Sequence, residues 1–170
     1  MDHADYKAKR DTGTFSYAAH AAVVAVDPET GEVEILDYVI VEDGGVLVNP
    51  MIVDGQVFGG TAQGIGTALY EEMPYDAQGQ PLASTLSDYM LPGPTEVPEI
   101  RILHMETPSP YTRFGQKGIG EGGAIAPPAA IANAVNDAVR GLGAELLVSP
   151  ITPRRIAEAI DRARQQTVAA

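Results

Sequence analysis

The chain has 170 residues, of which 23 are acidic and 11 are basic, so its formal net charge is −12. This charge argues against non-specific binding to nucleic acid or anionic membranes, which requires basic surface. The absence of cysteine excludes disulfides, thiolate metal sites and an iron–sulfur cluster held by this chain alone. No apolar stretch approaches the roughly 18 residues of a transmembrane helix. We expect a cytoplasmic protein, although export with a signal-bearing partner stays open.

The first half of the chain predicts a β-hairpin followed by a helix. Residues 1–14 are polar and predict a flexible N-terminal segment. Residues 18–26 and 33–42 predict paired strands, because the DPETGE sequence between them is a strong turn signal. Asn49 and Pro50 suit the cap and first turn of a helix that runs to about residue 72. The apolar residues expected on its buried face are Ile52, Val53, Val57, Ile65, Leu69 and Tyr70.

The second half predicts mixed strands and two helices. The proline-rich residues 91–98 predict an extended loop, followed by a strand over 100–106. Prolines open a helix over 127–139, a short strand is expected at 146–148, and a final helix starts at Thr152-Pro153. The buried stripes expected on these helices are Ile131, Ala134, Val135 and Ala138, then Ile156, Ala159, Ile160 and Ala163.

Together these elements predict an α+β fold: a hairpin, a glycine-rich helix, mixed strands and two C-terminal helices. The predicted domain is partial and covers residues 15–164, and residues 165–170 form a frayed tail. Five glycines, each costing roughly 0.5–1 kcal/mol relative to alanine, interrupt the first helix. They serve close helix packing, contact with a cofactor, or both. They are Gly55, Gly59, Gly60, Gly64 and Gly66.

A second glycine-rich segment holds one acidic residue. Residues 115–123 read GQKGIGEGG, which places Glu121 among five glycines just ahead of a predicted helix. Because glycine lets a backbone approach a bulky ligand, this carboxylate is a candidate general base. On spacing alone, a plainer explanation is favoured: Glu121 caps the 127–139 helix or pairs with Lys117. Lys117 is itself either a phosphate contact or, as is more common, a solvated side chain.

Other polar residues are weaker candidates. The amide of Gln63 can both donate and accept hydrogen bonds, which suits an oxo-metal or pterin partner, but a surface glutamine is the plainer explanation. His20 lies in a predicted apolar strand and is expected to be a hydrogen-bonded core residue. The scattered histidines predict no zinc or iron site with protein ligands. Glu71 and Glu72 are expected at a solvated helix end.

Three groups of segments resemble the molybdenum hydroxylases, the family of xanthine dehydrogenase, aldehyde oxidase and carbon monoxide dehydrogenase. The first group is VAVDPETGEV with DGGVLVNP, and the second is GQVFGGTAQGIG with LYEE. The third is ETPSP, KGIGEG and PPAAIANAV. Their order and spacing over about residues 15–160 resemble the C-terminal part of the molybdenum-binding large subunit.

The resemblance implies an enzyme that oxidises an aldehyde or an N-heterocycle with oxygen from water. It implies that Glu121 is the base that deprotonates the metal-bound hydroxyl. Molybdenum would be held by the pterin, with no protein ligand. The residues that would contact the cofactor are Gln63, Gly60, Gly64, Lys117, Gly118 and Gly120.

The resemblance also implies cofactors and partners. The cofactor would be molybdopterin in its cytosine dinucleotide form, with 2Fe–2S and FAD on partner chains. Because the family's large subunit is several times longer, we expect a split subunit or a fragment that binds little cofactor alone and exposes apolar surface. Two alternatives stay open: a non-catalytic assembly or scaffold domain, and an unrelated acidic ligand-binding domain whose glycines serve packing only.

Overall fold

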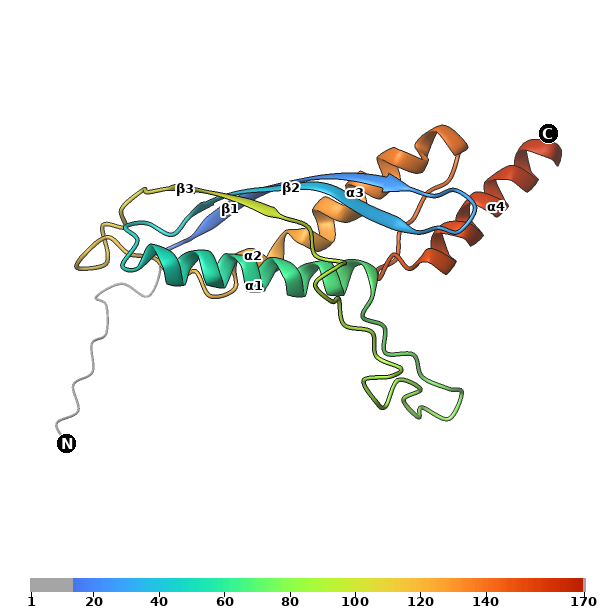
Figure 1. Cartoon of the computed structure of the whole chain (residues 1–170), viewed down its shortest axis with the longest axis horizontal. Helices are drawn as coiled ribbons and strands as arrows, with labels where there is room; N and C mark the ends of the chain where they lie inside the picture. Colours follow the sequence, from blue (N-terminus) through green and yellow to red (C-terminus); the bar gives the residue numbers. More distant parts are fainter. Residues whose placement is uncertain (1–13, 170) are drawn as a thin grey trace.

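The computed structural model describes residues 14–169, so the N-terminal segment expected at 1–14 lies almost wholly outside the described residues. A three-stranded sheet forms one layer, with strand order β1–β2–β3. β1 (Tyr17–Val26) pairs antiparallel with β2 (Val33–Asp43), and β3 (Ile100–Met105) pairs parallel with β2. The predicted hairpin and third strand are thus confirmed (Figure 1).

The hairpin turn is built by Asp27 and Gly31. The Asp27 carboxylate accepts hydrogen bonds from the backbone N–H groups of Glu29 (2.8 Å) and Thr30 (3.2 Å). Gly31 has a φ of +76°, a conformation that favours glycine. A Cβ there would lie 2.1 Å from the carbonyl oxygen of Pro153, so the turn packs directly against the start of the last helix.

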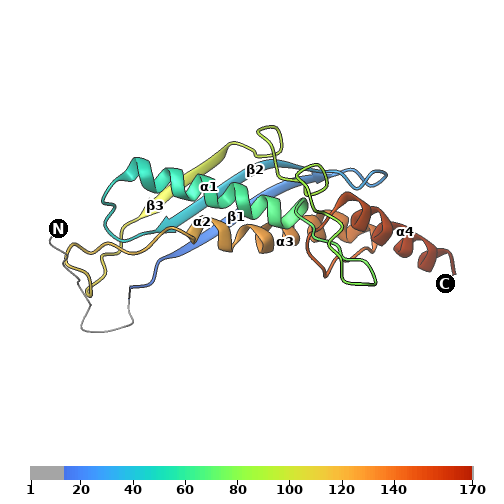
Figure 2. The ribbon, with the colours of Figure 1, turned by 90° about the horizontal axis from the view of Figure 1, so that it is seen from below.

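The helices lie on one face of the sheet, as the two ribbon views show (Figures 1 and 2). They are α1 (Pro50–Leu69), α2 (Gly122–Ile125), α3 (Pro127–Val139), the 3₁₀ helix η1 (Arg140–Leu142) and α4 (Pro153–Ala169). Asn49 caps α1, its side-chain oxygen accepting from the backbone N–H of Ile52 at 3.3 Å. The predicted start of α1 is confirmed, but the helix ends at Leu69 rather than near residue 72.

The core lies between the sheet and these helices. Tyr38 and Ile40 of β2 are fully buried, as are Val57, Ile131 and Ile160 of three different helices. His20 also faces this layer, and its Nδ1 lies 3.0 Å from the Tyr38 hydroxyl, so the hydrogen-bonded histidine expected there is confirmed. Burial lowers the pKa of His20.

Two helix positions predicted to be buried are exposed instead. Ile52 is 57% exposed, because the buried stripe of α1 follows Val53 and Val57, and Ile52 lies about 100° away from that stripe. In α3 the stripe continues from Val135 to Val139, one full turn on, so Ala138 is exposed.

One segment prediction also needs correction. Residues 146–148 form no strand, because Asn136 takes the place of a strand partner: its side chain bonds both the N–H (2.8 Å) and the carbonyl (2.9 Å) of Leu146. The last helix spans Pro153–Ala169 and so includes residues 165–169, where fraying stays a prediction.

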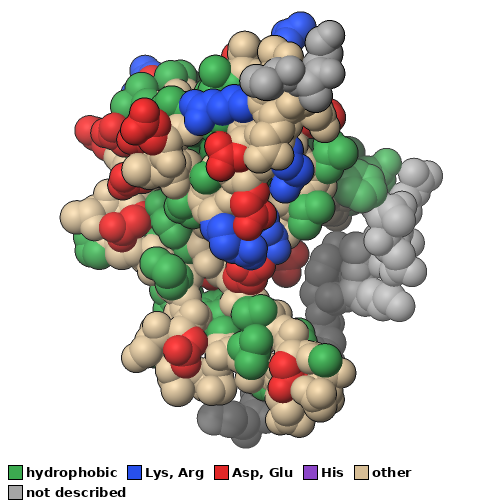
Figure 3. All heavy atoms as spheres, turned by 90° about the vertical axis from the view of Figure 1, so that its right-hand side faces the viewer, with side chains coloured by type: hydrophobic (Ala, Val, Ile, Leu, Met, Phe, Trp, Pro, Cys, Tyr) green, Lys and Arg blue, Asp and Glu red, His purple; other side chains and the backbone are tan. Residues whose placement is uncertain are grey.

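The pair after α1 is not a solvated helix end. Glu71 accepts a hydrogen bond from the Tyr89 hydroxyl, and Glu72 pairs with Arg155 of α4. Seen from the α4 end, basic side chains lie among acidic ones (Figure 3). The long loop that follows α1 extends away from the sheet and helices (Figure 1).

No helix within residues 14–169 combines the length and hydropathy needed to cross a membrane.

Candidate functional site

The glycine loop is fastened to the sheet through Asp43, the last residue of β2. Its carboxylate accepts hydrogen bonds from the N–H of Gly45 (2.9 Å), the N–H of Thr107 (3.1 Å), the Tyr17 hydroxyl (2.9 Å) and Lys117 Nζ (3.0 Å). Burial alone would raise the pKa of Asp43, but these hydrogen bonds outweigh it and hold that pKa well below its usual range. Three segments distant in sequence, at Tyr17, Thr107 and Lys117, are thereby fixed around one carboxylate.

Lys117 lies inside this cluster rather than in solvent. Its side chain is 6% exposed, and its Nζ lies 5.0 Å from the centroid of the Tyr17 ring. The solvated lysine and the Glu121–Lys117 pair considered from the sequence are therefore both wrong. A cofactor contact by Lys117 stays a prediction, and its ammonium group is already engaged with Asp43.

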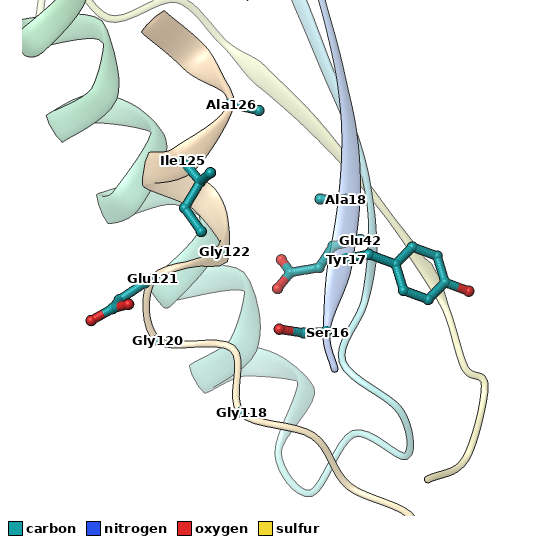
Figure 4. Close-up of a pocket in the computed structure, with 10 residues that line it drawn as sticks. All are labelled: Ser16, Tyr17, Ala18, Glu42, Gly118, Gly120, Glu121, Gly122, Ile125 and Ala126. Carbon is teal, nitrogen blue, oxygen red and sulfur yellow. The ribbon is translucent and has the colours of Figure 1, made fainter. Parts of the chain in front are cut away.

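Glu121 stands at the N-terminus of α2, on the wall of a cavity of about 630 Å³. The cavity is formed by the start of β1, the end of β2 and residues 118–126 (Figure 4). Glu121 is exposed and makes no capping hydrogen bond, so the alternative of a helix-capping glutamate is wrong for its side chain. Figure 4 shows its carboxylate directed away from β1.

Two of the predicted cofactor contacts leave open space beside Glu121. A Cβ at Gly118 would meet no atom within 4 Å, and one at Gly120 would meet only Gln56 Oε1, at 3.9 Å. Packing against the described residues therefore does not require glycine at either position. The backbone here is accessible to another molecule, and this arrangement fits a bulky ligand such as a pterin.

The predicted contacts on α1 do not line this cavity. A Cβ at Gly60 would lie 3.0 Å from Ala124 N, and one at Gly64 would lie 2.7 Å from Pro127 Cγ. Close helix packing, one of the two explanations for the α1 glycines, is thus confirmed at these positions, and a cofactor role stays a prediction. Gln63 is exposed on the same helix.

Sequence reasoning missed one member of the cavity wall, Glu42. The residue is 1% exposed, and neither carboxylate oxygen has a hydrogen-bond partner among the described residues. Burial raises its pKa, partly opposed by the charge of His104. Strand alternation was the available signal, because Glu42 shares the inward parity of Tyr38 and Ile40.

Comparison with known proteins assigns the chain to a family. A family model described as molybdopterin cofactor-binding domain matches residues 2–98. The chain belongs to this family. Within it, the domain corresponds to part of the large subunits of molybdenum hydroxylases.

Curated relatives of the domain share extensive identity with it. It is 45% identical over 145 residues to the nicotine 6-hydroxylase large subunit of Paenarthrobacter nicotinovorans, covering 85% of this chain and 18% of that protein. It is 36% identical over 143 residues to the carbon monoxide dehydrogenase large chain of Hydrogenophaga pseudoflava, covering 84% and 18%. The chain therefore spans less than a fifth of the length of these relatives.

Solved structures share the fold. Quinoline 2-oxidoreductase from Pseudomonas putida 86 matches with a TM-score of 0.81 and 48% identity, covering 84% of this chain and 18% of that chain. The Cu,Mo-CO dehydrogenase matches with a TM-score of 0.84 and 31% identity, covering 88% and 19%. The predicted fold class, part of a molybdopterin-binding domain, is confirmed.

Proposed function

We propose that this chain forms the C-terminal portion, or a split subunit, of a molybdenum hydroxylase that oxidises an aldehyde or N-heterocycle with oxygen from water. The observation that carries the proposal is the position of Glu121. Its carboxylate is exposed, free of a capping hydrogen bond, and flanked by the open backbone of Gly118 and Gly120. A base must be able to reach the proton that it accepts. Among the described residues the carboxylate of this glutamate has no hydrogen-bond partner.

The cofactor would be molybdopterin, and when bound it supplies the molybdenum and accepts the electrons of the reaction. We assign to Glu121 the removal of a proton in that reaction, and to the backbone at Gly118 and Gly120 the close approach to the cofactor. Gln63 would add an amide contact. Gly60 and Gly64 hold α1 against α2 and α3, and Lys117 holds the loop against Asp43.

The proposed assembly extends beyond this chain. We propose that the remainder of the molybdenum-binding subunit completes the pterin site, that the pterin carries a cytosine dinucleotide, and that 2Fe–2S and FAD subunits carry electrons onward. We also propose a cytoplasmic complex acting on a small-molecule substrate. The size of the relatives supports this view, because the domain covers only 18% of each large subunit.

The first test is purification of the tagged chain from its native host, with co-purifying chains identified and molybdenum counted per copy. Larger partners with about one molybdenum per copy would support a split catalytic subunit. In that complex Glu121→Gln should lower kcat by about 10²–10⁴-fold, the contribution typical of a general base. Glu29→Gln, at an exposed turn residue, is the control and should leave kcat unchanged.

A non-catalytic scaffold domain is the alternative, and the same experiment distinguishes it. Turnover of the Glu121→Gln complex within a few-fold of wild type would refute the assignment of the base. A metal-free chain that purifies alone would point to a fragment or a scaffold.

A further inference from the structure

The cavity beside α2 contains a buried carboxylate that the proposed reaction does not use. Glu42 projects from β2 towards the segment at Gly122, opposite the side on which Glu121 points outward (Figure 4). Both of its oxygens are buried, and neither has a hydrogen-bond partner among the described residues. A buried polar group without a partner is costly, so a missing donor is indicated.

The neighbouring basic side chains do not donate to Glu42, and His104 Nδ1 has no hydrogen-bond partner among the described residues. Lys117 Nζ is bonded to Asp43, and His104 Nε2 lies 2.7 Å from Asp54 Oδ1. A Cβ at Gly122 would lie 2.7 Å from Glu42 Oε1, so glycine at this position leaves room for the carboxylate. The carboxylate therefore lies at the cavity wall without a donor among the described residues.

The cavity has the charge and size for a cationic group. Its two acidic lining residues are Glu42, which points inward, and Glu121, whose carboxylate points outward, and none of the described residues that line it is basic. Its volume of about 630 Å³ greatly exceeds the roughly 30 Å³ that one water takes up in the liquid. No group of three or more His, Asp or Glu side chains within the described part of the chain could hold a metal ion, so the observations favour an organic cation.

We propose that this cavity binds a guanidinium group, which donates paired N–H bonds to the two oxygens of Glu42. A planar guanidinium matches a carboxylate with two parallel hydrogen bonds, whereas an ammonium acts as a point charge. The group would come from an arginine of the larger subunit or from a free guanidinium compound. This proposal does not depend on the role of Glu121 as a base.

The test follows the carboxyl carbon of Glu42 by NMR in the full chain labelled with ¹³C at glutamate carboxyls. Methylguanidinium chloride should lower the pKa of Glu42 by about one unit or more, the effect of a close opposite charge. Tetramethylammonium chloride carries the same charge without N–H donors, and at equal ionic strength it should leave this pKa unchanged. Glu42→Gln identifies the signal, and Glu42→Asp replaces it if that variant fails to fold.

Glu121→Gln is the matched control, because it removes the outward-pointing carboxylate beside the cavity and should keep most of the methylguanidinium effect. Equal effects of the two salts, or no effect of either, would overturn the proposal. Repeating the titration in a complex with the larger subunit distinguishes the two sources. If the pKa of Glu42 is already lowered in the complex and methylguanidinium lowers it no further, the guanidinium comes from an arginine of that subunit. If methylguanidinium still lowers this pKa in the complex, the guanidinium comes from a free compound.

Discussion

Lys117 and Asp43 form a buried ion pair that closes the glycine loop onto the end of β2. The Nζ and Oδ1 atoms are 3.0 Å apart, and the two side chains are 6% and 0% exposed. Because Glu121 is only four residues beyond Lys117, the pair also restricts where the proposed base can lie. We therefore propose that the ion pair positions this glutamate, a role that does not require Lys117 to contact the cofactor.

Lys117→Met should destabilise the chain by about 3 kcal/mol or more, because it leaves Asp43 buried without its cation. Chemical denaturation at neutral pH measures the loss. Arg154→Met is the control, since the Arg154–Glu158 pair on α4 is exposed and should contribute less than about 1 kcal/mol. Similar losses in both variants would contradict a structural role for the buried pair.

Asp43 should also make the chain sensitive to acid. Its pKa is held below the usual range in the folded state, so its stabilisation is present above its unfolded pKa of about 3.9 and is lost as pH falls through the folded pKa. Asp43→Asn should therefore remove part of the decline in unfolding free energy below about pH 4. Urea titrations across this range test the slope, and an unchanged slope would exclude Asp43 as its source.

The α1 glycines provide a matched pair. Gly64→Ala should destabilise by about 1–3 kcal/mol, because its Cβ would lie 2.7 Å from the ring of Pro127. Gly59 lies on the same helix, and a Cβ there would meet no described atom within 4 Å. Gly59→Ala should therefore stabilise the folded state by about 0.5–1 kcal/mol through helix propensity. Thermal unfolding of both variants checks the opposite signs. Two stabilising substitutions would mean that α1 does not pack closely on Pro127.

The elements were largely predictable because their signals are local. The DPETGE turn, the Asn49 cap and the prolines that open α3 and α4 each act within a few residues, and all lie where the sequence predicted. The site was less predictable because it depends on neighbours distant in sequence. Nothing local indicates that Lys117 meets Asp43, or that β3 pairs parallel with β2.

Glycine roles show the same limit. From the sequence, the glycines of α1 could serve either close packing or contact with a cofactor. The position of Pro127 opposite Gly64, known only from the structure, shows that Gly64 serves packing. Glu42 is the opposite case, because alternation along β2 already places it on the buried face. Its missing partner, however, depends on what fills the cavity.

Glu42 should oppose stability at neutral pH. Burial raises its pKa, so the folded state favours the protonated carboxyl. The stabilisation that protonation gives to the folded state is present below the unfolded pKa and is lost as pH rises through the folded pKa. In the chain without added ligand, Glu42→Gln should therefore raise the unfolding free energy near pH 7 by about 1 kcal/mol and have less effect near pH 4. Denaturation at both pH values measures this, and a loss of stability at the higher pH would show that Glu42 has a donor already.

The outer face of the sheet should make the isolated chain self-associate. Val23 of β1 and Leu103 and Met105 of β3 are each more than half exposed, and Leu103 is paired in register with Val41. The helices cover the opposite face, so these side chains have no cover from the described residues (Figures 1 and 2).

Burying a leucine contributes about 1.5–3 kcal/mol, so Leu103→Lys should weaken self-association about tenfold or more, as measured by sedimentation equilibrium. Leu86→Lys, in the long loop and 78% exposed, is the control. An equal effect of both variants would place the contact outside the sheet face.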